Sequence, residues 1–291
     1  SHMQEELSSV AKHLALAPSS ENDIEQLGLG HLNILYIALK LVEFEYYRNH
    51  EILNIMVIEE PEAHIHTHIQ RSLFDNLKVS SNYTQVIMTT HSTYLSEVSN
   101  IRQMNVLKRQ GKHSVVMNPA NKLEEYGKKA LNLKVRSMEI CLERYLDAKR
   151  SVLLFSKGVI LVEGDGEEIL IPELVKKGLG VTLDELGIGL INVGSVAFEY
   201  IASIFSEERL QRYCAIITDS DSCVNGSEKS SPRAAQLGDN RKGKFDTLFN
   251  GNQYVEVAYA PHTLEIDFYN EPANRQYIKN VINECYSDNN T

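Results

Sequence analysis

The sequence predicts an α/β protein of two lobes, in which helices flank mainly parallel sheets. Two observations support this prediction. Short apolar runs alternate with segments of helical periodicity along most of the chain, which is typical of parallel strands joined by right-handed helical crossovers. Several of the apolar runs also end in a polar cluster, as buried strands do when their carboxyl ends open into a site.

The first half of the chain contains helices and strands in alternation. Residues 4–26 are polar. Apolar residues then recur at helical spacing from Leu32 to Tyr47, after the turn Leu-Gly-Leu-Gly at 27–30. The elements expected next are a strand over 52–58, a helix over 66–78, a strand over 85–89, and a hairpin over 101–118 with Gly111 in its turn.

A helical segment over 123–154 is expected to connect the two lobes. The elements expected after it are strands over 158–163, 188–193, 213–218 and 253–259, and helices over 166–177, 196–205 and 273–285. Residues 222–243 are rich in Ser, Gly and Lys, and we expect them to form a loop.

Composition limits the class of protein. The chain has 291 residues, is 43% hydrophobic, and contains no apolar stretch long enough to span a membrane. Its four cysteines lie far apart without a Cys-x-x-Cys pair, which argues against a disulfide framework or structural zinc and favours the cytoplasm. The opening Ser-His-Met, residues 1–3, is typical of a cleaved purification tag, so we expect the chain to be cut from a longer protein.

The net charge of −10 argues mildly against nucleic acid as a partner. The charge of residues 229–244 differs from that of the whole chain. This segment contains five basic residues and one acidic residue, Asp239. We expect Arg241, Lys242 and Lys244 to contact DNA phosphates, although a solvated basic surface is the alternative.

Carboxylates gather after two strands of the second half. Glu163 and Glu167 follow the strand over 158–163, and Asp219 and Asp221 follow the strand over 213–218. No Lys or Arg lies beside them in the sequence to neutralise their mutual repulsion, and a hard divalent cation removes such repulsion. The sequence therefore predicts a Mg²⁺ site.

The first half has its own candidate site. The strand over 52–58 leads into Glu59 and Glu60, which suit a water-bridged Mg²⁺ ligand and a residue that orients the attacking water. His91, after the next strand, is placed to contact a γ-phosphate. Gly28 and Gly30 open a helix, and backbone N–H groups at a helix N-terminus bind phosphate. Taken singly, each feature also fits an ordinary end of a strand or helix.

The order of these features resembles the C-terminal lobe of an ABC-type ATPase head. The wording Ile-Glu-Glu-Pro-Glu-Ala-His-Ile-His at 58–66 is similar to the OLD (overcoming lysogenisation defect) family. The resemblance implies structural roles for His64, His66 and His68 rather than a metal site. No Gly-x-x-x-x-Gly-Lys-[Ser/Thr] occurs in the chain, so ATP is expected as a cofactor of the intact protein only. The resemblance to an ABC-type ATPase head also implies a homodimer or higher oligomer that forms through the ATPase domain.

Residues 155–270 resemble a Toprim domain of the OLD type. The matching elements are Val162-Glu163-Gly164 with Glu167, Asn192-Val-Gly-Ser195, Asp219-Ser-Asp221, and Thr263-Leu-Glu265. OLD nucleases carry a lysine downstream of the last acid. Either Lys279 serves in this position, or the corresponding lysine lies beyond Thr291. The resemblance implies that Glu163, Glu167, Asp219, Asp221 and Glu265 bind two Mg²⁺ or Mn²⁺ ions, and that with Lys279 they cut DNA.

These resemblances divide the chain into an ATPase part at 4–122, a helical connector at 123–154 and a Toprim nuclease domain at 155–291. They imply a metal-dependent endonuclease or nickase, active in bacterial anti-phage defence with a helicase-like or other defence partner. The alternative is an ATP-dependent DNA clamp of the SMC-like class with a non-catalytic Toprim domain. A topoisomerase or a primase lacks support, since neither a helix-turn-helix tyrosine domain nor a zinc ribbon is found.

Overall fold

The computed structural model describes residues 28–49, 51–77, 84–93, 100–130, 135–146, 150–194, 198–220 and 232–285. The chain forms two compact units, Ser1–Val98 and Ser99–Thr291, and each is described by itself. Within the described residues, no helix is both long enough and apolar enough to cross a membrane. The predicted mixed α/β architecture is confirmed.

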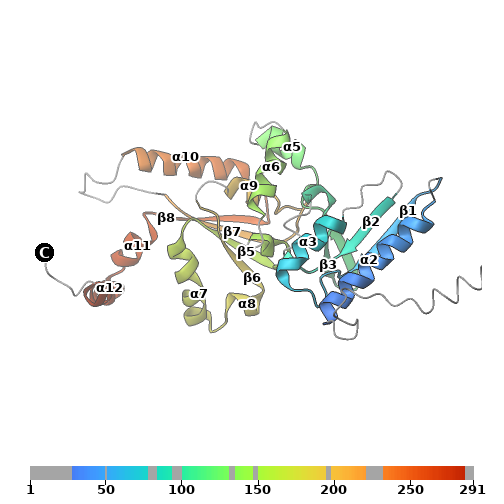
Figure 1. The fold of residues 1–291 in the computed structure, drawn as a ribbon. Helices are drawn as coiled ribbons and strands as arrows, with labels where there is room; N and C mark the ends of the chain where they lie inside the picture. The colour runs from blue at the N-terminus through green and yellow to red at the C-terminus, as the bar shows by residue number, and fades with distance from the viewer. Residues whose placement is uncertain are drawn as a thin grey trace, which may run out of the picture. The chain divides into compact units, whose positions relative to one another are not determined.

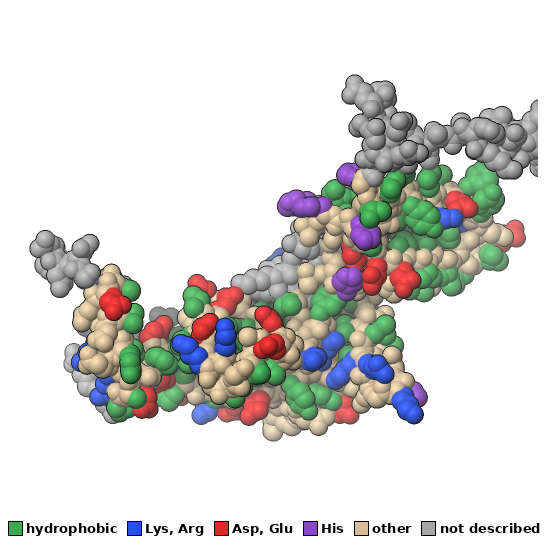
Figure 2. Space-filling model, turned by 90° about the horizontal axis from the view of Figure 1, so that it is seen from below, with side chains coloured by type: hydrophobic (Ala, Val, Ile, Leu, Met, Phe, Trp, Pro, Cys, Tyr) green, Lys and Arg blue, Asp and Glu red, His purple; other side chains and the backbone are tan. Residues whose placement is uncertain are grey.

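Within its described residues, the first unit contains two helices and two parallel strands. They are α2 (Leu29–Tyr47), β1 (Asn54–Glu59), α3 (Thr67–Leu77) and β2 (Thr84–Thr89). The register places Glu59 opposite Thr89 at the carboxyl ends of the strands. Strand β1 is less buried than predicted, because Ile55 and Val57 on one of its faces are exposed. Hydrophobic side chains are visible over the surface of this unit in Figure 2.

The second unit begins with the predicted hairpin and helical segment. The elements are η2 (Ile101–Gln103), β3 (Val106–Gln110), β4 (His113–Met117), α5 (Leu123–Ala130), α6 (Val135–Tyr145) and η3 (Arg150–Leu154). Strands β3 and β4 are antiparallel, and the turn between them needs the positive φ of 61° that Gly111 adopts. The helical segment over 123–154 is thus several short helices rather than one.

The rest of the second unit is a parallel sheet with helical crossovers. Its elements are β5 (Gly158–Val162), α7 (Asp165–Leu179), α8 (Leu183–Leu186), β6 (Ile188–Asn192), α9 (Phe198–Ala202), β7 (Tyr213–Asp219), α10 (Pro232–Leu248), β8 (Val255–Ala260), α11 (Leu264–Asn270) and α12 (Pro272–Cys285). All pairs are parallel, in the order β6-β5-β7-β8. Figure 1 shows α7 and α8 on one side of this sheet and α9 and α10 on the other, as right-handed crossovers require.

One hydrophobic core joins the sheet to the segment before it. Ile101, Met117 and Leu142 are buried in the same cluster as Leu161 and Ile216 of the sheet. Residues 101–154 therefore pack as part of the second unit, whereas the sequence suggested a hairpin in the first lobe and a connector after it. The domain boundaries at 122 and 155 remain a prediction about the extent of the family domains. The boundary between the two compact units lies elsewhere, between Val98 and Ser99.

Helix α10 corrects the prediction of a loop over 222–243 for residues 232–243, whereas residues 222–231 lie outside the described residues. Residues 232–248 are helical, Gly238 and Phe245 lie on the buried side of the helix, and buried Phe249 follows directly after it. The rings of Phe245 and Phe198 lie 6.0 Å apart, centroid to centroid. Glycines have low helix propensity, and two of them, together with polar residues, hide the helical period in this segment. Tertiary burial of the phenylalanines stabilises the helix instead.

Replacing a buried phenylalanine of α10 should destabilise the second unit. We expect Phe245→Ala, at a side chain 1% exposed, to lower the free energy of unfolding by about 3–5 kcal/mol. Leu237→Ala is the control on the same helix, since Leu237 is 56% exposed and its loss should change stability by less than about 0.5 kcal/mol. Chemical denaturation followed by circular dichroism measures both. Equal losses for the two variants would contradict the assigned face of α10.

Candidate functional site

The four strand ends of the parallel sheet bring candidate residues to one edge. Glu163 follows β5, Asn192 ends β6, Asp219 ends β7, and Glu265 lies in α11 shortly after β8. The chain leaves β5 toward one side of the sheet, whereas it leaves β6 and β7 toward the other (Figure 1). Ligand sites of open α/β sheets lie at such a switch point. Glu163 occupies it.

Two glycines, Gly164 in the turn after β5 and Gly166 at the start of α7, lie next to carboxylates. A Cβ at Gly164 would lie 3.1 Å from Oε2 of Glu167, and a Cβ at Gly166 would lie 3.6 Å from Oε1 of Glu265. Glu167 is buried although it is acidic, and it comes from the first turn of α7. Carboxylates from α7 and α11 therefore converge on the turn that Glu163 begins.

A hydrogen bond between side chains connects the start of α7, directly after this turn, to the neighbouring strand β6. The side-chain amide of Asn192 donates to Oδ1 of Asp165 at 2.7 Å, and its own oxygen accepts the N–H of Gly194 at 3.1 Å. Asp165 was not among the predicted site residues. Its position between two glycines in Glu-Gly-Asp-Gly-Glu is the signal that could have marked it, and it begins α7 directly after the turn.

Glu163 is neutralised by an arginine, contrary to the expectation from the sequence. Nη1 of Arg241 lies 2.6 Å from Oε2 of Glu163, and both side chains are 21% exposed. The hydroxyl of Thr218 donates to the same oxygen at 2.9 Å and accepts from Nη1 of Arg241 at 2.9 Å. The residues lie 78 positions apart, so inspection of neighbours in the sequence misses the pair.

Close packing of α10 on the end of β7 places Arg241. A Cβ at Gly238 would lie 2.0 Å from the carbonyl oxygen of Ser220, so only glycine fits at this contact. Arg241 follows Gly238 by three positions and therefore lies on a similar side of the helix. The glycine that obscured the helix in the sequence is thus what allows α10 to bring a guanidinium to the carboxyl edge.

The other predicted basic residues have different surroundings. Lys242 lies over the ring of Tyr259, with Nζ 5.3 Å from the centroid. Burial, with a contribution from the Asp246 carboxylate, raises the pKa of Tyr259 to about 12, so this ring stays uncharged at neutral pH. Lys244 pairs with Glu199 at 2.6 Å. Lys279 is exposed on α12, and no ion pair with a predicted acid is found for it within the described residues.

The donor chemistry at this edge fits a divalent cation. Carboxylate oxygens are the ligands that Mg²⁺ and Mn²⁺ prefer, and glycines leave space where Glu167 and Glu265 approach the turn. Among the described residues, however, no three His, Cys, Asp or Glu side chains are grouped closely enough to hold an ion together. Asp221 and Ser195 lie outside the described residues. The ligand set stays a prediction.

The first unit brings its predicted residues together at the ends of β1 and β2. Nδ1 of His91 lies 3.3 Å from Oε1 of Glu60, which has a positive φ of 43°. Glu62 is buried, and its Oε1 accepts the hydroxyl of Thr90 at 2.6 Å and the N–H of His91 at 3.0 Å. Glu59 ends the strand beside them, opposite Thr89. The sequence analysis missed Glu62, which orders the backbone of His91.

The glycine turn of α2 is tied to the loop after β1. The side chain of Asn33 donates to the carbonyl oxygens of Pro61 at 3.3 Å and Ala63 at 2.9 Å. A Cβ at Gly30 would lie 2.4 Å from the carbonyl oxygen of His64, whereas a Cβ at Gly28 would meet nothing within 4 Å. His64 has a positive φ of 64°, so its backbone is strained where it meets Gly30.

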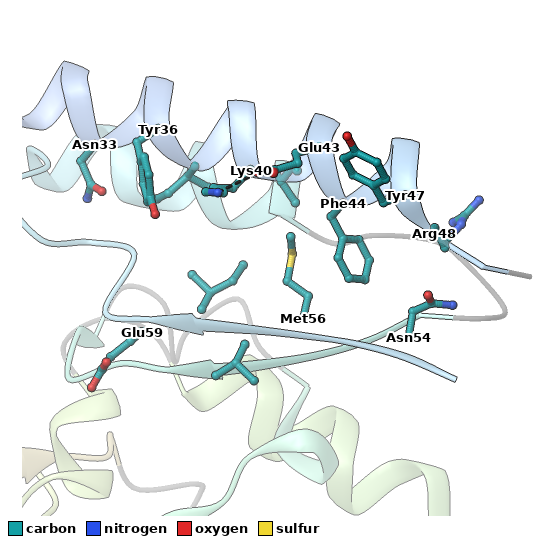
Figure 3. A pocket seen from close by; sticks show the side chains of 14 residues that line it. Asn33, Tyr36, Lys40, Glu43, Phe44, Tyr47, Arg48, Asn54, Met56 and Glu59 are labelled. Atoms are coloured by element: carbon teal, nitrogen blue, oxygen red, sulfur yellow. Dashed lines mark hydrogen bonds and ion pairs between the residues drawn. The ribbon is translucent and has the colours of Figure 1, made fainter. Parts of the chain in front are cut away.

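The histidines of this loop do not form a metal site in the described part of the chain. The rings of His66 and His68 lie 4.9 Å apart and tilted by 32°, which is a packing contact. A cavity of about 690 Å³ lies between α2 and β1 (Figure 3), and Tyr36, Phe44 and Met56 point into it. Its lining is mainly apolar and lies along the helix.

The two glycines of α2 offer a matched test of this packing. Gly30→Ala should loosen the first unit, because the new methyl group meets a backbone carbonyl that cannot rotate away, at a cost of about 1–3 kcal/mol. Gly28→Ala should cost less, about 0.5–1 kcal/mol, because alanine is a poorer N-cap than glycine but its methyl group would meet no atom within 4 Å. Hydrogen exchange of peptides from residues 28–93 measures both. Equal protection in the two variants would refute the close approach of Gly30 and His64.

Comparison with known families supports the assignment of both parts. Residues 154–221 match the family model described as overcoming lysogenization defect protein-like, TOPRIM domain. Residues 5–95 match the family model of the AAA ATPase domain. The match thus begins with the segment before β5 and ends at Asp221, and it includes the turn after β5 and the end of β7.

Two curated relatives are similar to the chain over longer stretches. One is an OLD nuclease of Thermus scotoductus, 28% identical over 176 residues, which are 60% of this chain and 31% of that protein. The other is endonuclease GajA of Bacillus cereus, 27% identical over 243 residues, with coverages of 76% and 34%. The chain spans about a third of the length of the curated relatives that it matches.

Solved structures with some similarity are C-terminal regions of OLD proteins. That of Xanthomonas campestris pv. campestris is 23% identical with a TM-score of 0.33, covering 48% of this chain and 66% of that one. That of Burkholderia pseudomallei is 24% identical with a TM-score of 0.32, covering 45% and 66%. The sequence matches, rather than these scores, carry the assignment. The chain thus contains residues that match an AAA ATPase domain, followed by residues that match an OLD-like TOPRIM domain, and it is similar to proteins of the OLD family.

Proposed function

We propose that the protein is a metal-dependent DNA endonuclease or nickase of the OLD type. The observation that carries the proposal is the placement of Glu163, Glu167 and Glu265 at the carboxyl edge of the parallel sheet, directly after β5, in the first turn of α7 and in α11. Asp219 ends the adjacent strand at the same edge. Two relatives are named as nucleases, which supports the same reaction for this chain.

In this proposal the carboxylates hold Mg²⁺ or Mn²⁺. Glu163, Glu167 and Asp219 serve mainly one ion, and Asp221 and Glu265 mainly the other. Bound ions of this kind lower the pKa of a water molecule and stabilise the leaving oxygen of a phosphodiester. The chain itself orients the ligands, since the contact between Asn192 and Asp165 fixes the turn that presents Glu163. Lys279 is the proposed downstream lysine.

DNA is the proposed substrate and partner. Arg241, Lys242 and Lys244 on α10 are the proposed phosphate contacts, and salt-dependent binding should follow from them. Figure 2 shows basic and acidic side chains interspersed over the visible face of the second unit.

We propose a regulatory role for the first unit. Glu59, Glu60 and His91 meet at one end of its strands, and Gly28 and Gly30 open the helix tied to the same loop. In the intact protein this arrangement would act on ATP across a homodimer or higher oligomer. We further propose a cytoplasmic role in bacterial anti-phage defence, with a helicase-like or other defence partner.

A second function is favoured by the ion pair between Arg241 and Glu163. An arginine that neutralises a predicted metal ligand permanently would suit a Toprim domain without catalytic activity. The protein would then be an ATP-dependent DNA clamp of the SMC-like class. Cutting of DNA separates the two proposals.

Nicking of supercoiled plasmid with Mg²⁺ or Mn²⁺ tests the endonuclease directly. The wild-type chain should cut, and Glu167→Gln and Asp219→Ala should each reduce the rate by at least about 100-fold, since each removes a charged ligand of the metal. Glu173→Gln is the matched control, because Glu173 lies on the same helix as Glu167 but is exposed. It should cut at the wild-type rate.

Two results would count against the endonuclease. Absence of cutting by the wild-type chain with either metal would favour the clamp. Full activity of Asp219→Ala or Glu167→Gln would refute the assigned ligands and place any activity elsewhere in the protein.

ATP hydrolysis gives a separate test of the first unit. The chain has no phosphate-binding loop motif, so the purified protein should release no phosphate from ATP above background. Glu60→Gln should therefore leave phosphate release unchanged. Measurable ATP turnover by this chain, abolished by Glu60→Gln, would show that its ATP site is complete.

A further inference from the structure

We propose that Arg241 is an internal counter-cation of the TOPRIM site, which occupies Glu163 in the metal-free protein and is displaced when a divalent cation binds. This inference rests on the proposed nuclease function for the identity of the metal site. It adds a residue that sets the affinity of that site for metal. Its starting observation is the contact of 2.6 Å between Nη1 of Arg241 and Oε2 of Glu163.

One oxygen atom of Glu163 takes both hydrogen bonds. Oε2 accepts from Nη1 of Arg241 at 2.6 Å and from the hydroxyl of Thr218 at 2.9 Å. A carboxylate oxygen that carries two donors has no free lone pair directed at a metal. In addition, a guanidinium and a divalent cation at the same carboxylate would repel each other. Coordination through Oε2 therefore requires Arg241 to leave or to turn aside, and a cation bound to Oε1 would still be repelled by the guanidinium, which favours the same displacement.

The arginine is not a chance neighbour on a loose surface. Thr218, its second partner, is 1% exposed, and α10 is anchored by the close contact of Gly238 with Ser220 and by buried Phe245. The backbone of Arg241 is thus held in place, and movement falls to its side chain, which is 21% exposed. A side chain in this position can alternate between two arrangements while the helix stays packed.

Helix α10 contains a second ion pair, which does not involve a predicted metal ligand. Nζ of Lys244 lies 2.6 Å from Oε1 of Glu199, the same distance as in the pair of Arg241 and Glu163. Glu199 belongs to α9 and is not a predicted ligand. Removing Lys244 therefore removes one positive charge and one ion pair from α10 without freeing a carboxylate of the proposed metal site.

Metal affinity measured without DNA tests the proposal. Isothermal titration of the full chain with Mn²⁺, and electron paramagnetic resonance of the free Mn²⁺, should show about tenfold tighter binding for Arg241→Gln than for wild type. Arg241→Lys should give an intermediate affinity, because it keeps the charge but loses the planar donor group. Lys244→Gln should bind Mn²⁺ as wild type does.

Thermal melting provides a second measurement. Without metal, Arg241→Gln should melt at a lower temperature than wild type, because Glu163 loses its partner. With saturating Mn²⁺ the difference should shrink, since tighter binding stabilises the variant more. A purely structural role would instead lower the melting temperature equally with and without Mn²⁺ and leave the affinity unchanged.

The possible results distinguish failure of the counter-cation role of Arg241 from failure of the proposed metal site. If wild type binds Mn²⁺ and Arg241→Gln binds it equally or more weakly, the counter-cation role is refuted and the metal site stands. If neither protein binds Mn²⁺, the proposed metal site fails, and the counter-cation role fails with it. In proteins that carry Glu163→Gln, arginine and glutamine at position 241 should give the same affinity for Mn²⁺. A difference in affinity that persists in this background would also refute the proposal.

Discussion

The parallel order β6-β5-β7-β8 is the constraint on which the candidate nuclease site depends. It places β5 between neighbours whose following helices lie on the other side of the sheet, so the turn after β5 opens at the carboxyl edge. Glu163 begins that turn, Asp219 ends the neighbouring strand, and Glu265 returns to the turn from α11. Residues about 100 positions apart in the chain are brought together by strand order alone.

Charge balance at this edge explains how such a site can exist without metal. Adjacent carboxylates destabilise a fold unless a cation or hydrogen-bond donors compensate them. Here Arg241 and Thr218 compensate Glu163, and Asn192 compensates Asp165. The protein thus supplies its own donors at the positions nearest the predicted ligands. Metal binding becomes an exchange of one cation for another, which makes affinity adjustable through a residue that is not itself a ligand.

The local pattern of the sequence was sufficient to predict the strands and the acidic residues that follow them. Apolar runs ending in Glu163 or Asp219 mark strand ends directly, and the longer helices α7 and α12 follow from periodicity, whereas the short helices α8 and α11 were not predicted. Helix α10 was missed, because Gly238 and Gly243 weaken a signal that only burial of Phe245 reveals. The pairing of Arg241 with Glu163 was missed for a different reason. It depends on the packing of α10 against β7, which no local pattern encodes.

The most direct measurement of the central claim is a crystal structure of the chain soaked in Mn²⁺, with the ions located by anomalous scattering. The account predicts Mn²⁺ at the carboxyl edge of the sheet, bound by Glu163 and Asp219, with the guanidinium of Arg241 moved away from Glu163. Mn²⁺ bound elsewhere, or an intact contact between Arg241 and Glu163 beside a bound ion, would contradict it.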